Sequence, residues 1–278
     1  MKNILLLVHD DAGQEARFQA ALDVVRAVEG HLTCLDVSIM PALMDDGLGN
    51  AGTAMLLDDE RAREASNRET LQARLAKELV AWDWTDATGA IAPLLTEASA
   101  LADLIVVNRK LDAFPVPDME AVAREVIVTA DKPILAVPDS GRGVDVCGRV
   151  LVCWDGSAPA RAAVRAAVPL LALADSVTLL EVEDGSIKAP AEDAAAYLSR
   201  HGIEPMVARQ SVLRGKPAEA IVDEVRRRNI DYVVMGGFGH LRLTEALFGG
   251  VTPPCWPKAR CPCSWRIRLG AIPPRPFC

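Results

Sequence analysis

The sequence predicts an α/β protein with two tandem doubly wound parallel-sheet domains. Its 278 residues, half of them apolar, are enough for two domains of ordinary size. Short apolar runs alternate with stretches of helical periodicity, which is typical of βα units around a parallel sheet. The same order of runs occurs twice along the chain, so we interpret the second half as a repeat of the first.

The first half, residues 1–140, has the elements of one such domain. Strands are predicted near residues 3–9, 31–37, 103–107 and 133–137, with 79–84 as a candidate for the middle strand. Helices are predicted near residues 12–29, 55–81, 91–100 and 117–129. This half is longer than the second, and residues 40–54 are interpreted as the insertion that accounts for most of the difference.

The second half, residues 146–267, follows a polar, glycine-bearing linker at Asp139–Asp145. Its strands are predicted near residues 149–154, 175–183, 204–212 and 231–235, and its helices near 158–172, 189–201, 216–228 and 243–256. Right-handed crossovers between these elements give a second doubly wound sheet.

Aspartates occupy matching places in the two halves. The first strand of each half ends in Asp10 or Asp155, so Asp10 is expected to lie where Asp155 lies. At the carboxyl edge of a doubly wound sheet, Asp155 could accept hydrogen bonds from a ribose or from an adenine amino group. It could equally be the N-cap of the helix that begins at Ala158.

A glycine-rich segment follows the last predicted strand of the repeat. Gly236, Gly239 and Gly249 have the spacing G-x2-G-x9-G, and Gly250 follows directly. Glycine lets the backbone approach a ligand, and N–H groups at the start of a helix favour anions, so the segment predicts phosphate binding. The spacing is neither the Rossmann fingerprint nor the P-loop. Tight turns alone are the alternative role of these glycines.

This segment resembles the nucleotide loop of the universal stress protein family. Val152–Ala162 is similar to the family's first strand and loop, Gly215–Val222 to the start of its third helix, and Lys132–Pro138 to its closing strand. The resemblance covers nearly the whole chain and implies two domains of the adenine nucleotide alpha hydrolase-like, Rossmann-like fold. It implies a regulatory stress-response protein, not an enzyme, that binds ATP or AMP in its C-terminal half. No metal is then expected beyond nucleotide-bound Mg²⁺.

The resemblance also implies which residues bind the adenine nucleotide: Asp155, Gly156, Ser157, Val182, Met235, Gly236, Gly239, His240, Gly249, Gly250 and Thr252. Gly250 replaces the family's usual hydroxyl. The first half has no glycine after its corresponding strand, which implies a degenerate domain without a nucleotide site. The halves are expected to pack as an intramolecular pseudo-dimer, with a homodimer also allowed. An interaction module of the same fold that needs no nucleotide is the alternative.

Residues 253–278 differ abruptly in composition from the rest of the chain. They hold four of the seven cysteines and seven of the eighteen prolines. Two interpretations are a disordered proline-rich tail and a zinc site, although the cysteine spacing matches no common zinc knuckle. We favour a frameshifted end, because regrouping the codons from their third base permits a helix and an apolar strand followed by a stop. This hypothesis predicts that the second sheet loses its last strand.

Composition and charge exclude several classes of protein. A net charge of -8 argues against nucleic acid or an anionic membrane as the main partner. The N-terminal apolar run is too short for a signal peptide or a spanning helix, so a cytoplasmic protein is expected. Cys34, Cys147 and Cys153 are expected to be reduced thiols. No catalytic trio can be assembled, and the four histidines share no ligand spacing and no nearby cluster of Cys and Glu: His9, His31, His201 and His240.

Overall fold

The computed structural model describes residues 1–39, 49–109, 118–139, 142–211, 217–236 and 263–266. The first half contains β1 (Asn3–Val8), α1 (Gln14–Val28), β2 (His31–Ile39), α2 (Gly49–Leu75), β3 (Ala81–Gly89), α3 (Ile91–Ala98), the short 3-10 helix η1 (Ser99–Leu101), β4 (Leu104–Asn108), α4 (Met119–Thr129) and β5 (Ile134–Val137). The second half contains β6 (Arg149–Trp154), α5 (Ala158–Leu171), β7 (Ser176–Glu183), α6 (Ala191–Ser199), β8 (Met206–Ser211), α7 (Pro217–Arg228), β9 (Tyr232–Val234) and β10 (Cys263–Arg266).

The prediction of two doubly wound parallel sheets is confirmed. In the first half, the strands lie in the order β3-β2-β1-β4-β5, and every neighbouring pair is parallel. In the second half, β9, β6, β7 and β8 are likewise parallel neighbours. Each sheet therefore changes direction of winding beside its first strand, β1 or β6, and doubly wound folds bind ligands at such switch points.

One helix and one strand differ from the sequence expectation. Helix α2 begins at Gly49, inside the stretch interpreted as an insertion, and ends at Leu75, several residues before the predicted end. The middle strand β3 runs to Gly89, beyond the predicted segment. Along β3 every side chain is half-buried or exposed, because this is an edge strand whose polar residues face solvent, and its apolar signal is weak.

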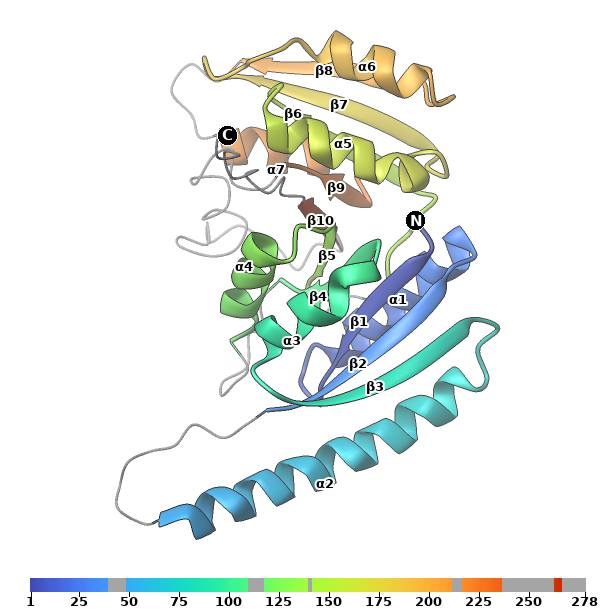
Figure 1. Cartoon of the computed structure of the whole chain (residues 1–278). Helices are drawn as coiled ribbons and strands as arrows, with labels where there is room; N and C mark the ends of the chain where they lie inside the picture. Colours follow the sequence, from blue (N-terminus) through green and yellow to red (C-terminus); the bar gives the residue numbers. More distant parts are fainter. Residues whose placement is uncertain (40–48, 110–117, 140–141, 212–216, 237–262, 267–278) are drawn as a thin grey trace, which may run out of the picture.

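Strand β10 joins the two sheets into one of ten strands (Figure 1). It pairs in parallel with β9, as β5 pairs with β4, and it pairs antiparallel with β5. The prediction that the second sheet loses its last strand is therefore wrong, because residues 263–266 of the present sequence form that strand. A frameshift would change the side chains of this segment, but neighbouring strands pair through backbone hydrogen bonds, which do not depend on those side chains. Most of the tail, residues 253–262 and 267–278, lies outside the described residues.

The apolar core lies on both faces of this sheet. On one face, a continuous cluster extends from the first half to the second and includes buried residues of α1, α2, α5 and α6. On the other face, α3 and α4 cover the first half, and α7 covers the second. Among the helices that the structure describes, none combines the length and the apolar character needed to cross a membrane.

Candidate functional site

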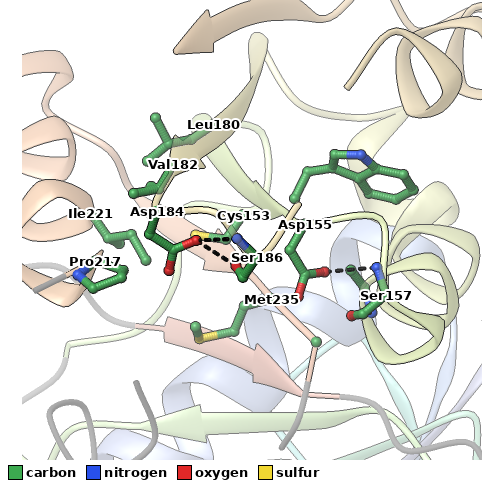
Figure 2. Close-up of a pocket in the computed structure, with 13 residues that line it drawn as sticks. Cys153, Asp155, Ser157, Leu180, Val182, Asp184, Ser186, Pro217, Ile221 and Met235 are labelled. Carbon is green, nitrogen blue, oxygen red and sulfur yellow. Dashed lines mark hydrogen bonds between the residues drawn. The ribbon is translucent and has the colours of Figure 1, made fainter. Parts of the chain in front are cut away.

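A cleft lies at the carboxyl ends of β6, β7 and β9, the place where the fold is expected to bind ligands. The volume of the cleft, including the part that is open to solvent, is about 600 Å³. Figure 2 shows Asp155 and Ser157 on one side and Val182, Pro217 and Ile221 on the other. Five of the predicted site residues line it: Asp155, Ser157, Val182, Met235 and Gly236.

The turn from β6 into α5 shapes one wall of the cleft. The Asp155 carboxylate accepts a hydrogen bond from the backbone N–H of Ser157 over 2.9 Å, and the Ser157 hydroxyl accepts one from Ala160 N–H over 3.3 Å. Ser157, not Asp155, is therefore the N-cap of α5. An ionised carboxylate accepts about four hydrogen bonds, more than the one from Ser157 requires.

Two glycines of the predicted site fit where a side chain would not. Gly156 has φ +70, and a Cβ built on it would lie 2.2 Å from the backbone N of Ala189. A Cβ on Gly236 would lie 2.6 Å from the backbone N of Ala160. Gly236 thus lets the chain leaving β9 pass directly over the first turn of α5, and the N-terminus of a helix favours an anion.

Five predicted site residues fall in residues 237–262, outside the described residues: Gly239, His240, Gly249, Gly250 and Thr252. Their part in the site stays a prediction. Val182 is described, and its carbonyl accepts a hydrogen bond from Asp184 N–H over 3.0 Å. The side chain of Val182 contributes to the apolar wall of the cleft.

The cleft also has lining residues that the sequence did not single out. Asp184 follows β7 and accepts a hydrogen bond from Ser186 N–H over 2.9 Å. The sequence signal that could have identified Asp184 is its position directly after a predicted strand, which is also the position of Asp155. Cys153 lies in the floor, where burial and then the nearby Asp155 charge raise the pKa of its thiol to about 12. This thiol stays protonated at neutral pH, so it is a poor nucleophile.

In the first half, an arginine occupies the corresponding place. Arg17 has no exposed side-chain surface. Its guanidinium donates to the backbone carbonyls of Leu7 and His9 over 3.1 Å and 3.0 Å. It also donates to the side chains of Asp11 and Asn108. The end of the first strand is therefore closed by the protein itself.

The strand register corrects the expected match between Asp10 and Asp155. Ile4 pairs with Leu104 as Val150 pairs with Tyr232, which places His9 level with Asp155. In the turn that follows, the Asp11 carboxylate accepts a hydrogen bond from Gly13 N–H over 2.7 Å, as the Asp155 carboxylate accepts one from Ser157 N–H. Asp10 has neither role, because the turn into α1 is longer than the turn into α5.

The same register shows what replaces the loop's first glycine. Counting from the paired residues Leu104 and Tyr232, Asn108 is level with Gly236. Asn108 is fully buried and donates to the carbonyl of Gly13 over 3.2 Å. The first half thus has a hydrogen-bonded side chain, that of Asn108, at the position where the second half has Gly236 and no side chain.

The expectation for the histidines is wrong at His9. This residue is 1% exposed, and its Nδ1 lies 2.7 Å from Glu64 Oε1 and 3.9 Å from Glu60 Oε1. Both glutamates lie on α2, more than fifty residues away in sequence, so spacing along the chain could not reveal the cluster. The three cysteines Cys34, Cys147 and Cys153 are free thiols, as predicted.

Comparison with known proteins adds to this geometry. Residues 147–264 match the sequence model of the Universal stress protein family. The C-terminal half is a universal stress protein domain. The matched residues include β6 and its turn, the cleft and the glycine-rich segment after β9. A search of curated proteins gives no significant match to the chain.

A solved universal stress protein shares the fold. A universal stress protein from Archaeoglobus fulgidus DSM 4304 matches 96% of this chain and 98% of its own, with a TM-score of 0.69 and 18% identity. UspA from Lactobacillus plantarum and a family member from Burkholderia pseudomallei each match 49% of this chain and 96% of their own. Their TM-scores are 0.41 and 0.39, with identities of 19% and 21%. Family and fold together support a stress-response protein.

Proposed function

We propose that the protein is a stress-response regulator that binds ATP or AMP in the cleft of its C-terminal domain. The observation that carries this proposal is Gly236, which brings the chain within van der Waals reach of the first turn of α5 beside an open cleft. Phosphates bind at helix N-termini where backbone can approach closely. The family membership of residues 147–264 supports an adenine nucleotide as the ligand.

The shape of the cleft supports separate places for base and phosphate. Val182, Pro217 and Ile221 form an apolar wall on which a base can lie, while Asp155 offers a carboxylate to a ribose or an amino group. Gly236 and the start of α5 form the end suited to phosphate. The glycines and Thr252 beyond Gly236 complete the proposed site.

The proposed role is regulatory and not catalytic. Of the thirteen residues that line the cleft, none is a histidine, and the Cys153 thiol has a pKa raised to about 12. The Ser157 hydroxyl accepts a hydrogen bond from Ala160 N–H and so serves as the N-cap of α5, and the Ser186 hydroxyl donates to the carboxylate of Asp184. The lining residues thus lack the histidine base that activates the serine of a Ser–His–Asp triad.

An interaction module that needs no nucleotide is the second candidate. The observation that favours it is the joined sheet, in which β5 and β10 meet antiparallel and the strand orders of the halves run outward from that seam. This arrangement supports the proposed intramolecular pseudo-dimer. Arg17 closes the corresponding end of the first half, so that domain contributes packing without a ligand.

Calorimetric titration of the full chain with ATP and with AMP tests the leading proposal. Nucleotide at about 100 times its Kd should stabilise the fold by about 2.7 kcal/mol, seen as a rise in Tm. D155N should weaken binding about tenfold, because a charged acceptor is lost while the amide oxygen can still accept from Ser157. D175N is the matched control, since Asp175 is exposed at the opposite edge of the sheet, just before β7. Neither heat nor a Tm change at millimolar nucleotide would leave the interaction module as the function.

A further inference from the structure

A second cluster of ligand-type side chains lies in the first half, away from the nucleotide cleft. His9 at the end of β1 meets Glu60 and Glu64 of α2, and the three potential ligand atoms all lie within 4.8 Å of one another. His9 and Glu64 are buried, and the Glu60 side chain is 14% exposed. Residues four apart on a helix lie on one face, so the carboxylates of Glu60 and Glu64 can contact the same ion.

Asp36 provides an independent observation beside this cluster. Its side chain is 4% exposed, and its Oδ1 has no hydrogen-bond partner. Asp36 is level with Val8 in the pairing of β1 with β2. It shares a sheet face with Leu32 and Cys34, the face that α2 covers through Leu71 and Leu75. The carboxylate is therefore on the α2 side of the sheet, at the level where β1 ends at His9.

Glu60 also has an oxygen without a hydrogen-bond partner. Its Oε1 is buried and unpaired, while Oε2 accepts from Arg63 over 2.6 Å. Native proteins leave few buried polar atoms unpaired, and an unseen ion is one of the recognised explanations. Two such oxygens, on Asp36 and Glu60, occur around the same histidine.

The charges around this point do not balance. Asp36, Glu60, Glu64 and the neighbouring Asp86 are acidic, while the cations are Arg63, Arg68 and, when protonated, His9. A bound cation would offset this excess of buried negative charge.

We propose that His9, Glu60 and Glu64, with Asp36 as a fourth donor, bind a divalent metal ion of the Mn²⁺ to Zn²⁺ class. One imidazole with carboxylates is a donor set for such ions. Ligand atoms around one ion lie about 3 to 3.5 Å apart when each bond is about 2.0 to 2.2 Å, so small rotations suffice to gather them. The ion would take the place of the proton on His9 Nδ1, which lies 2.7 Å from Glu64 Oε1 and 2.9 Å from the carbonyl oxygen of Val37.

The position of the site gives the ion a structural role. Among the described side chains of α2, the buried apolar residues are Leu71 and Leu75, both at its C-terminal end. Toward the N-terminal end, Met55 and Leu56 are 68% and 59% exposed. A metal between Glu60, Glu64 and the end of β1 would attach this half of the helix to the sheet where apolar contacts do not.

Titration of the metal-free full chain with MnCl₂ tests the proposal, with binding followed by electron paramagnetic resonance and calorimetry. Mn²⁺ is chosen because thiolates, such as those of the tail cysteines, are poor ligands for it. We expect one ion per chain and at least a tenfold loss of affinity in E60Q. E69Q on the same helix is the matched control, since Glu69 is exposed, and its affinity should equal that of the original protein.

A second variant covers the case in which one substitution disturbs the fold. E64Q removes another proposed donor, and circular dichroism establishes that each variant retains its helices. A folded E60Q or E64Q that binds Mn²⁺ as tightly as the original protein overturns the proposal. So does equal loss in E69Q, because it would indicate binding to surface charge, and so does absence of binding at 1 mM Mn²⁺. Metal-dependent protection of α2 amides from hydrogen exchange, lost in E60Q, supports it.

Discussion

The carboxyl ends of β1 and β6 are equivalent positions in two copies of one fold, but side chains fill the space beyond β1 and a cleft lies beyond β6. In the first half, a buried arginine and Asn108 occupy the space beyond the strands. In the second, Gly236 passes over the start of α5 and leaves an open cleft. One copy fills the space at the ends of its strands with its own side chains, while the other leaves that space open. The comparison shows that two copies of one fold can keep the same packing while only one of them has a cleft at this position.

The largest expected effect is on Arg17. R17A removes a buried cation that donates to Leu7, His9, Asp11 and Asn108, and it leaves Asp11 without its ion pair. We expect a loss of about 3 to 5 kcal/mol in the free energy of unfolding, measured by urea denaturation.

The matched control is R161A in the second half, because Arg161 is also the fourth residue of its helix but is exposed. That substitution should change stability by less than about 0.5 kcal/mol. If the two variants were equally destabilised, Arg17 would not be the feature that closes the first half.

Acid should weaken the second half through Glu224. This residue has no exposed surface and accepts hydrogen bonds from Arg227 and Arg228, which lower its pKa to about 2. Because the folded pKa lies below the unfolded value of about 4.3, the stabilisation of about 3 kcal/mol is present above the unfolded pKa. It is lost as the pH falls from about 4.3 toward 2.

E224Q should therefore be less stable than the original protein at pH 7, and the difference should shrink as the pH approaches 2. Denaturation curves at several pH values measure this. E219Q, at an adjacent turn of α7, serves as the control and should keep the original pH dependence. A constant difference between E224Q and the original protein across this range contradicts the assignment.

A smaller effect is expected at Gly236. In G236A the new Cβ would approach the backbone of Pro159 and Ala160 to 2.7 and 2.6 Å, so β9 and α5 must separate. We expect a loss of about 1 to 3 kcal/mol, the usual range for overpacking, together with weaker nucleotide binding. G185A is the comparison variant: Gly185 has positive φ and its Cβ would meet nothing within 4 Å, so its cost reports backbone strain alone. Gly236 is not among the glycines with positive φ, so a G236A variant as stable as the original protein would contradict the close approach.

The smallest effect concerns the helix caps. Ser157 caps α5 through its hydroxyl, whereas Gly13 precedes α1 without a side-chain cap. S157A should cost about 1 kcal/mol, observed as a lower Tm. S157T, which keeps a hydroxyl, should recover most of that loss. An S157A variant as stable as the original protein would show that the cap does not stabilise the start of α5.

The sequence predicted the fold well where apolar runs were continuous. The strands β1, β4, β6 and β9 are buried on both faces, and their apolar runs gave strand positions close to those observed. Strand β3 was harder, because an edge strand carries polar residues and weak periodicity. Strand β10 was missed because its residues, Cys-Ser-Trp-Arg, have no strand-like pattern, and its position depends on the free edges of β5 and β9.

The residues of the candidate sites also differ in whether the sequence could predict them. Asp155, Ser157 and Gly236 could be found because each directly follows a strand, where chain order alone fixes the location. The Arg17 network and the His9 cluster could not, since each depends on contacts between residues far apart in sequence. Asp10 was matched to Asp155 because each follows the first apolar run of its half, and only the strand register revealed that His9 is level with Asp155.

The seam at β10 also determines which strand edges of the described sheet remain open to other chains. With β5 and β9 both paired to β10, the outer edges of the sheet are β3 and β8. These strands carry Asp83 and Asp86 on one side and Arg209 on the other, charged residues of the kind that disfavour edge-to-edge aggregation. Loss of the four residues of β10 would expose two buried, apolar strands as new edges. The short seam therefore covers two strand edges that would otherwise be free to pair with another chain.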